Sequence, residues 1–132
     1  MTTDEKVELA LSIAHTLQNL WEQKILKTKR HPSPKDLAIG RGEWQRWAIY
    51  YQKKLDLHQA IRLAKHMGNS PAVRSNPQRA AQTIFETMQR FQQKLERLYP
   101  SDLAEIFGYV GRFLEYLSWQ IQQEKRKERG EA

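Results

Sequence analysis

The chain has 132 residues, of which 39% are hydrophobic and 28% are charged, and its formal net charge is +7. This composition, with four Trp, five Tyr and four Phe, is typical of one globular domain with a modest core and excludes a disordered chain. The absence of Cys excludes disulfides, thiolate metal sites and Cys nucleophiles, and it fits a reducing compartment.

No segment has the pattern of a signal peptide or of a membrane-crossing helix. The amino terminus is acidic where a signal peptide would be basic, and no apolar run approaches ~18 residues. We therefore expect a cytoplasmic protein without a membrane partner. The apolar spacing is helical throughout, which predicts an all-α single domain over residues 1–132, with four to five helices in an antiparallel bundle or paired helical hairpins.

The first predicted helix begins at Thr2, which forms a capping-box motif with Glu5. Apolar residues then recur every three or four positions from Ala10 to Trp21, and basic residues follow them. The segment His31–Pro34 contains two prolines and ends the helix, because each proline removes a backbone donor and restricts the residue before it.

The second helical region, residues 43–67, changes its apolar face midway. Trp44, Trp47 and Tyr51 lie on one side, whereas the apolar residues from Leu57 onward lie on the opposite side. The first side continues instead as basic residues. Either the helix breaks near residues 53–55 so that both apolar halves reach one core, or it is continuous and the aromatic side chains face the same way as the basic ones.

Turn and cap residues delimit two further helices. Gly68-Asn69 predicts a left-handed cap, and Asn76 before Pro77 predicts the start of a third helix that ends at Pro100. Ser101 then caps a fourth helix. The charged segment 122–132 is expected to be a frayed tail.

The predicted fourth helix has two unusual features besides its main apolar stripe. Gly108 and Gly111 form, with Ala104, a small-residue strip that allows another backbone to approach, either the first or third helix or another subunit. Arg112, Tyr116 and Trp119 form a second face, which is typical of an interface, although Trp119 would equally serve to cover the end of the bundle.

Positive charge is concentrated in the middle of the chain. Between Lys24 and Arg79 there are thirteen Lys or Arg residues and three acids, whereas the rest of the chain has nine basic and twelve acidic residues. No carboxylate occurs between Asp56 and Glu86. Such a field repels itself and attracts phosphate backbones. The candidate nucleic-acid-binding residues are Lys54, His58, Arg62, Lys65, Arg74, Arg79, Lys27, Lys29 and Arg30.

Trp44 and Trp47 have two interpretations. They either stack unpaired bases beside the basic residues or fill the core, and we favour the core. Nothing in the chain has the pattern of a base-reading helix-turn-helix motif.

Catalytic motifs are absent from the sequence. There is no His-Glu-x-x-His, no Asp-x-Asp, no glycine-rich phosphate loop and no carboxylate pair. Arg62-x-x-x-His66 resembles the Arg and His pair of HEPN-type ribonucleases, but at a shorter spacing than in that family. We expect no enzyme activity, no metal site and no cofactor.

A short, basic, Cys-free and all-helical chain without an active site resembles the small subunit of CRISPR effector complexes. The resemblance covers the whole chain as a profile of length, helices and charge. It implies several copies stacked in a guide-containing ribonucleoprotein, beside larger subunits, with sequence-independent contact to a single-stranded target or displaced strand, of RNA or DNA. Two other interpretations stay open: a helical adaptor whose basic segment docks on an acidic protein, and a free-standing nucleic-acid chaperone.

Overall fold

The structure is a computed structural model that describes residues 1–128 and 130. The described residues form five helices of at least 13 residues and one four-residue helix, without a strand, so the all-α prediction is confirmed. The helices are α1 (Thr3–Thr28), α2 (Pro34–Leu37), α3 (Gly42–Lys54), α4 (Leu57–Asn69), α5 (Ser75–Leu95) and α6 (Pro100–Glu128).

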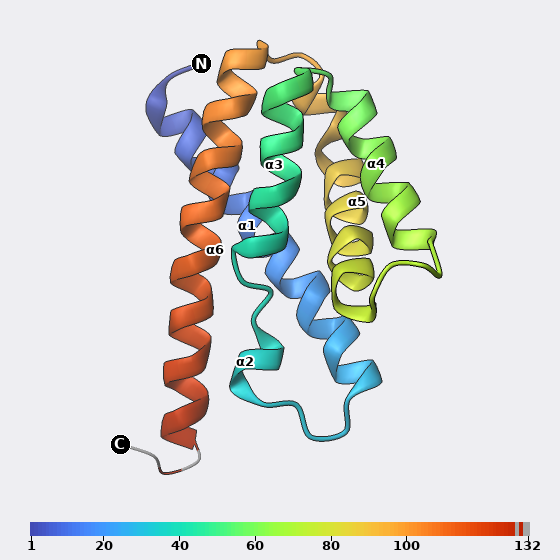
Figure 1. Ribbon diagram of the computed structural model, residues 1–132. Helices are drawn as coiled ribbons and strands as arrows, with labels where there is room; N and C mark the ends of the chain where they lie inside the picture. Colours follow the sequence, from blue (N-terminus) through green and yellow to red (C-terminus); the bar gives the residue numbers. More distant parts are fainter. Residues whose placement is uncertain (129, 131–132) are drawn as a thin grey trace.

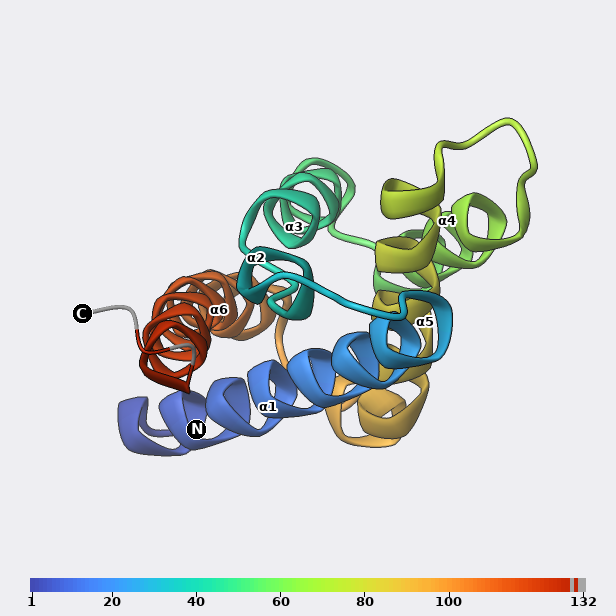
Figure 2. The same cartoon turned by 90° about the horizontal axis from the view of Figure 1, so that it is seen from below.

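Helices α3, α4, α5 and α6 run alternately up and down, and α1 lies across one side of the molecule against α5 and α6 (Figures 1 and 2). α1 begins beside the start of α6, where Lys6 forms ion pairs with Asp102 and Glu105 at 3.0 and 2.8 Å. It ends beside α5, where Lys24 contacts Glu86 at 2.7 Å. Consecutive helices from α3 onward are thus antiparallel, whereas α1 and α6 run in the same general direction.

An aromatic cluster forms the centre of the core. The ring of Phe107 in α6 lies 5.1–5.5 Å from the rings of Trp44, Trp47 and Tyr51 in α3. Trp44 Nε1 donates a hydrogen bond to the carbonyl of Phe107, and Trp47 Nε1 donates to that of Ala60. The three α3 side chains are at most 5% exposed, which confirms the core interpretation and leaves no face for a nucleobase.

The helical region from residue 43 to 67 is broken. Leu55 ends α3 in the left-handed conformation (φ 52°, ψ 32°), and Asp56 caps α4 by accepting a hydrogen bond from the backbone N–H of Gln59 at 3.1 Å. The chain reverses at this point. The apolar residues of α4 consequently face the same core as Trp44 and Trp47, as the first of the two alternatives predicts.

The junction of α4 and α5 differs from the prediction in two places. Gly68 is not a left-handed cap but a residue of α4, and its missing side chain lets α5 approach, since a Cβ there would lie 2.9–3.2 Å from atoms of Gln82. α5 begins at Ser75, one residue before the predicted cap Asn76, because the backbone of Arg74 accepts the first helical hydrogen bond, from the N–H of Gln78.

A short ordered connection joins α1 to α3 and contains α2. Ser33 and Asp36 form a capping box around α2, equivalent to the one that Thr2 and Glu5 form at α1. Buried Gln18 of α1 fixes the following turn, because its amide donates to the carbonyl of Leu37 at 2.7 Å and accepts from the N–H of Ile39 at 3.1 Å.

The last helix is longer than predicted. α6 begins at Pro100, before the predicted cap Ser101, and continues to Glu128. Residues 122–128 of the predicted frayed tail are therefore helical, and residues 129, 131 and 132 lie outside the described residues. Gly111 lies against Trp44 and Arg41 of the α3 segment, so neither the first nor the third predicted helix is its neighbour, while Gly108 faces open space.

Candidate nucleic-acid interface

One region of the surface is built without acidic side chains. Residues 57–85 contain no Asp or Glu, and they fold into α4 and the first half of α5, two antiparallel helices that pack closely together (Figure 1). We call this segment the acid-free hairpin. Glu86, the next carboxylate, binds Lys24 of α1 at 2.7 Å. The fold therefore places an acid-free stretch of sequence on two neighbouring helices, with Glu43 of α3 and Glu96 after α5 as carboxylates that lie against it.

The outer face of α4 carries most of the predicted basic stripe. His58, Arg62 and Lys65 are exposed, and their spacing of four and three residues places them on one face of the helix. Lys54 is exposed at the end of α3, just before α4 begins. Among these four side chains, His58 is the one that lies within 4 Å of a described carboxylate, 3.6 Å from Glu96. Lys54, Arg62 and Lys65 thus form no ion pair within the described part of the chain.

The remaining predicted residues lie where α1 ends and α5 begins. Lys27, Arg30 and Arg74 are exposed and form no ion pair with a described residue, whereas Lys29 binds Asp36 at 3.1 Å. Arg79 forms contacts within the fold. Its guanidinium lies 5.9 Å from the centre of the Trp21 ring and donates a hydrogen bond to the side chain of Asn76.

The structure brings some of these residues together and separates others. The end of α4 and the start of α5 lie about halfway down the molecule in Figure 1, and α1 ends below them, toward the lower end; these segments and the residues that directly follow or precede them carry Lys27, Arg30, Lys65 and Arg74. Lys54 lies at the opposite end of α4, a distance of about 20 Å for a helix of 13 residues. The candidate interface is therefore a band along α4 that continues toward the lower end of the molecule, which we call the basic end.

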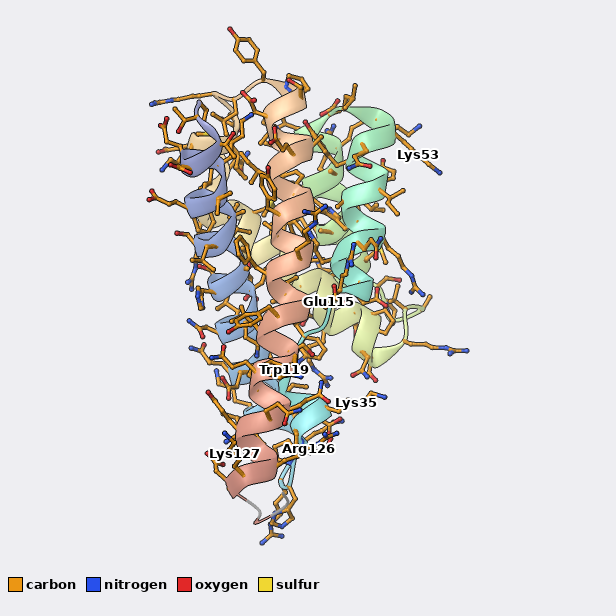
Figure 3. The ribbon with its side chains drawn as sticks, turned by 90° about the vertical axis from the view of Figure 1, so that its left-hand side faces the viewer. Lys35, Lys53, Glu115, Trp119, Arg126 and Lys127 are labelled. Atoms are coloured by element: carbon orange, nitrogen blue, oxygen red, sulfur yellow. The ribbon has the colours of Figure 1, made fainter. Side chains whose placement is uncertain are left out.

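Additional cations at this end were missed in the sequence. Lys35 projects from α2, and Arg126 and Lys127 project from the last turns of α6, below Trp119 in Figure 3. Treating residues 122–132 as a frayed tail excluded the α6 pair. The run Lys125-Arg126-Lys127 is the signal that would have found it.

The opposite end of the molecule has a different electrostatic character. Lys6 is held there between Glu105 and Asp102, whose hydrogen bonds raise the pKa of Lys6 to about 12, and the hydrogen bond from Lys6 lowers the pKa of Glu105. Lys94 lies beside Glu5 and Glu8 across a surface hollow. Cations at that end are interspersed with carboxylates, whereas residues 57–85 carry cations and no carboxylate.

Metal-binding side chains and cavities are the features of the described residues that bear on an active site. They contain no cluster of three or more His, Asp or Glu side chains placed to hold a metal ion. A cavity of about 330 Å³ lies between α3, α4 and α5 with a mainly apolar lining, and the two charged residues that line it, Glu43 and Arg46, bind each other at 3.0 Å. Arg62 and His66 are both exposed on α4 rather than gathered in a cleft.

Comparison of the chain with protein-family models, with curated proteins and with solved structures finds no match. Among the described helices, none combines the length and the apolar character that crossing a membrane requires.

Proposed function

We propose that this protein is a non-catalytic subunit of a CRISPR interference complex that holds a target or displaced nucleic-acid strand by its backbone, without sequence specificity. The observation that carries the proposal is the acid-free hairpin with its unpaired Arg and Lys cations. A surface that is merely solvated normally mixes charges of both signs. A row of Arg and Lys without carboxylates is favourable when an external polyanion neutralises it.

The geometry supports backbone contact rather than base reading. The cations are spread along α4 and over the basic end instead of converging on one pocket. Trp44, Trp47 and Tyr51 of α3 are buried in the core and cannot stack on bases. Phosphate contacts of this kind position a strand and carry no sequence information, which suits a subunit whose complex recognises sequence by base pairing.

The test compares two triple variants with the same change in net charge. The first replaces Lys54, Arg62 and Lys65 by Glu. The second replaces three exposed cations of α5 and the turn after it, which lie toward the other end of the molecule: Arg90, Lys94 and Arg97. Fluorescence anisotropy with single-stranded RNA and DNA at several salt concentrations measures binding, and circular dichroism checks that helicity is retained.

We expect the first variant to lose binding and the second to keep most of it. Each neutralised phosphate contributes about 0.7 to the log–log salt slope of a single strand, so losing three contacts lowers the slope by about 2. Equal losses from both variants would show that net charge alone matters. Wild-type protein that binds no strand at low salt, but binds an acidic polypeptide, would replace the proposal with the adaptor alternative.

A second test measures whether the first variant is incorporated into the complex. The first variant should still assemble beside the larger subunits, and the complex should engage its target poorly. If the variant fails to assemble, the α4 face is a protein interface instead.

A further inference from the structure

α6 carries an aromatic pair that the fold does not use. All four Trp lie within the described residues, and three are buried with their Nε1 atoms donating to backbone carbonyls, whereas Trp119 is 59% exposed. Tyr116, one turn earlier, is 57% exposed, and the two ring centroids are 6.2 Å apart with an interplanar angle of 32°. Trp119 therefore does not cover the bundle end. It lies outside the buried core and presents a large flat surface to solvent.

Arginines flank this pair on the same side of α6. At 3.6 residues per turn, Arg112 and Arg126 both lie within about 20° of Trp119 around the helix axis, one before it and one after it. They are about 21 Å apart along the axis at 1.5 Å per residue. Figure 3 shows Trp119 facing outward with Arg126, Lys127 and Lys35 below it, and α2, which carries Lys35, packs against α6.

The face is positively charged because its carboxylate is already bound. Glu115 lies beside Trp119, and its carboxylate accepts a hydrogen bond from Arg41 of the α3 segment at 3.0 Å. Glu124 and Glu128 lie about 140° and 180° from Trp119 around the helix. Neither Arg112 nor Arg126 forms an ion pair with a described residue, unlike Lys125, which binds Glu128 at 3.2 Å.

We propose that Tyr116 and Trp119 form a stacking platform for the unpaired bases of a single-stranded nucleic acid, with Arg112 and Arg126 holding the phosphates on either side. The inference rests on the proposed function and adds to it a second contact surface that recognises bases by their flat faces. The positive charge of this face determines which partner it can bind. A second copy of the chain in a two-fold contact would bring the same positive face against itself, which is repulsive, whereas a polyanion with flat apolar rings complements both features.

Two ligands of equal length separate base stacking from backbone binding: oligo(dT) and the corresponding abasic oligonucleotide, which keeps the sugar–phosphate backbone but has no bases. Intrinsic fluorescence comes from all four Trp, so the part that is lost in Trp119→Ala reports stacking on Trp119. We expect oligo(dT) to quench this fluorescence and the abasic strand to bind more weakly without quenching it.

The variants are Trp119→Ala and Tyr116→Ala, with Tyr99→Ala as the matched control because Tyr99 is 77% exposed at the other end of α6. Loss of one stacking ring should weaken oligo(dT) binding about tenfold, within a range of about 5- to 150-fold, and leave abasic binding unchanged. The Tyr99 variant should bind like wild type, and circular dichroism confirms that each variant is folded.

Each possible result supports or refutes the Tyr116–Trp119 platform. If both strands bind equally well and Trp119→Ala changes nothing, the platform is refuted while backbone binding by the acid-free hairpin stands. If oligo(dT) binding depends on Trp119 but not on Lys54, Arg62 and Lys65, the platform stands and the hairpin proposal fails. Absence of binding to either strand refutes both. Quenching by an acidic Glu-Tyr copolymer but not by oligo(dT) would assign the face to a protein partner and overturn the platform.

Discussion

Two glycines in helices provide a test of the packing that positions the candidate interface. Gly68 in α4 and Gly108 in α6 are both helical, so replacing either by Ala gains about 1 kcal/mol of helix propensity. Their surroundings differ. A Cβ at Gly108 would meet no atom within 4 Å, whereas a Cβ at Gly68 would lie 2.9 Å from Gln82 Cγ and 3.1 and 3.2 Å from the backbone N and Cα of Gln82.

The expected effects on the free energy of unfolding have opposite signs. Gly108→Ala should stabilise the protein by about 1 kcal/mol, which raises Tm by about 3–5 °C for a domain of this size. At Gly68 the added methyl overpacks a backbone contact, which costs about 1–3 kcal/mol and exceeds the gain in propensity, so Gly68→Ala should destabilise by about 1 kcal/mol. Chemical denaturation of both variants measures the difference. A Gly68→Ala protein as stable as Gly108→Ala would refute the close approach of α4 and α5 that builds the acid-free hairpin.

Three other changes test local structure. Gln18→Leu leaves the carbonyl and the N–H that Gln18 binds in the α2–α3 connection unpaired, so it should destabilise by about 2–4 kcal/mol in denaturant titrations, whereas exposed Gln23→Leu should have little effect. Leu55 has a left-handed backbone conformation, which Gly adopts without strain, and its side chain is 55% exposed, so little packing is lost on its removal. Leu55→Gly should therefore raise the free energy of unfolding by about 1 kcal/mol. A decrease would show that α3 and α4 form one continuous helix in solution. Hydrogen bonds from Ser33 and then Lys29 lower the pKa of Asp36 below its ordinary value of 3.8, so its carboxylate stabilises the fold above that pH and loses this effect as the pH falls through the lowered pKa. Thermal unfolding of wild type and Asp36→Asn should therefore differ at neutral pH and converge as the pH falls through the lowered pKa of Asp36, and a gap independent of pH would contradict this linkage.

Much of the fold follows from local patterns in the sequence. Apolar spacing identifies every long helix, and the reversal of the apolar face after Leu55 is explained by the break that the structure contains. Trp44 and Trp47 belong to the core because their spacing places them with Tyr51 on one face, opposite Phe107. These features depend on residues close together in the chain.

Features that depend on distant residues could not be predicted. Gly68 has the sequence signature of a helix cap, and only the position of Gln82, fourteen residues later, makes it a contact glycine. The start of α5 is displaced by two residues, with Arg74 rather than Asn76 as the cap, and residues 122–128 continue α6, which packs against α2. The gathering of Lys27, Lys35 and Arg126 at one end likewise requires the direction of three separate helices.

The positions of Lys27 and Lys35 suggest how one strand would reach both candidate surfaces. The acid-free hairpin and the Tyr116–Trp119 face belong to different helices, and Figure 2 shows α2 and the end of α1 between them; Lys27, Arg30 and Lys35 belong to this intervening segment and offer a positive path. A strand long enough to follow this path engages both surfaces at once, so its second contact is intramolecular and can raise affinity by about 10²–10⁴-fold over a short strand. Anisotropy with oligonucleotides of increasing length should show a steep rise at one length rather than a gradual increase. Replacing the three path residues by Glu should remove the step while leaving the affinity of short strands nearly unchanged, and a smooth length dependence in wild type would show that the two surfaces bind separate strands.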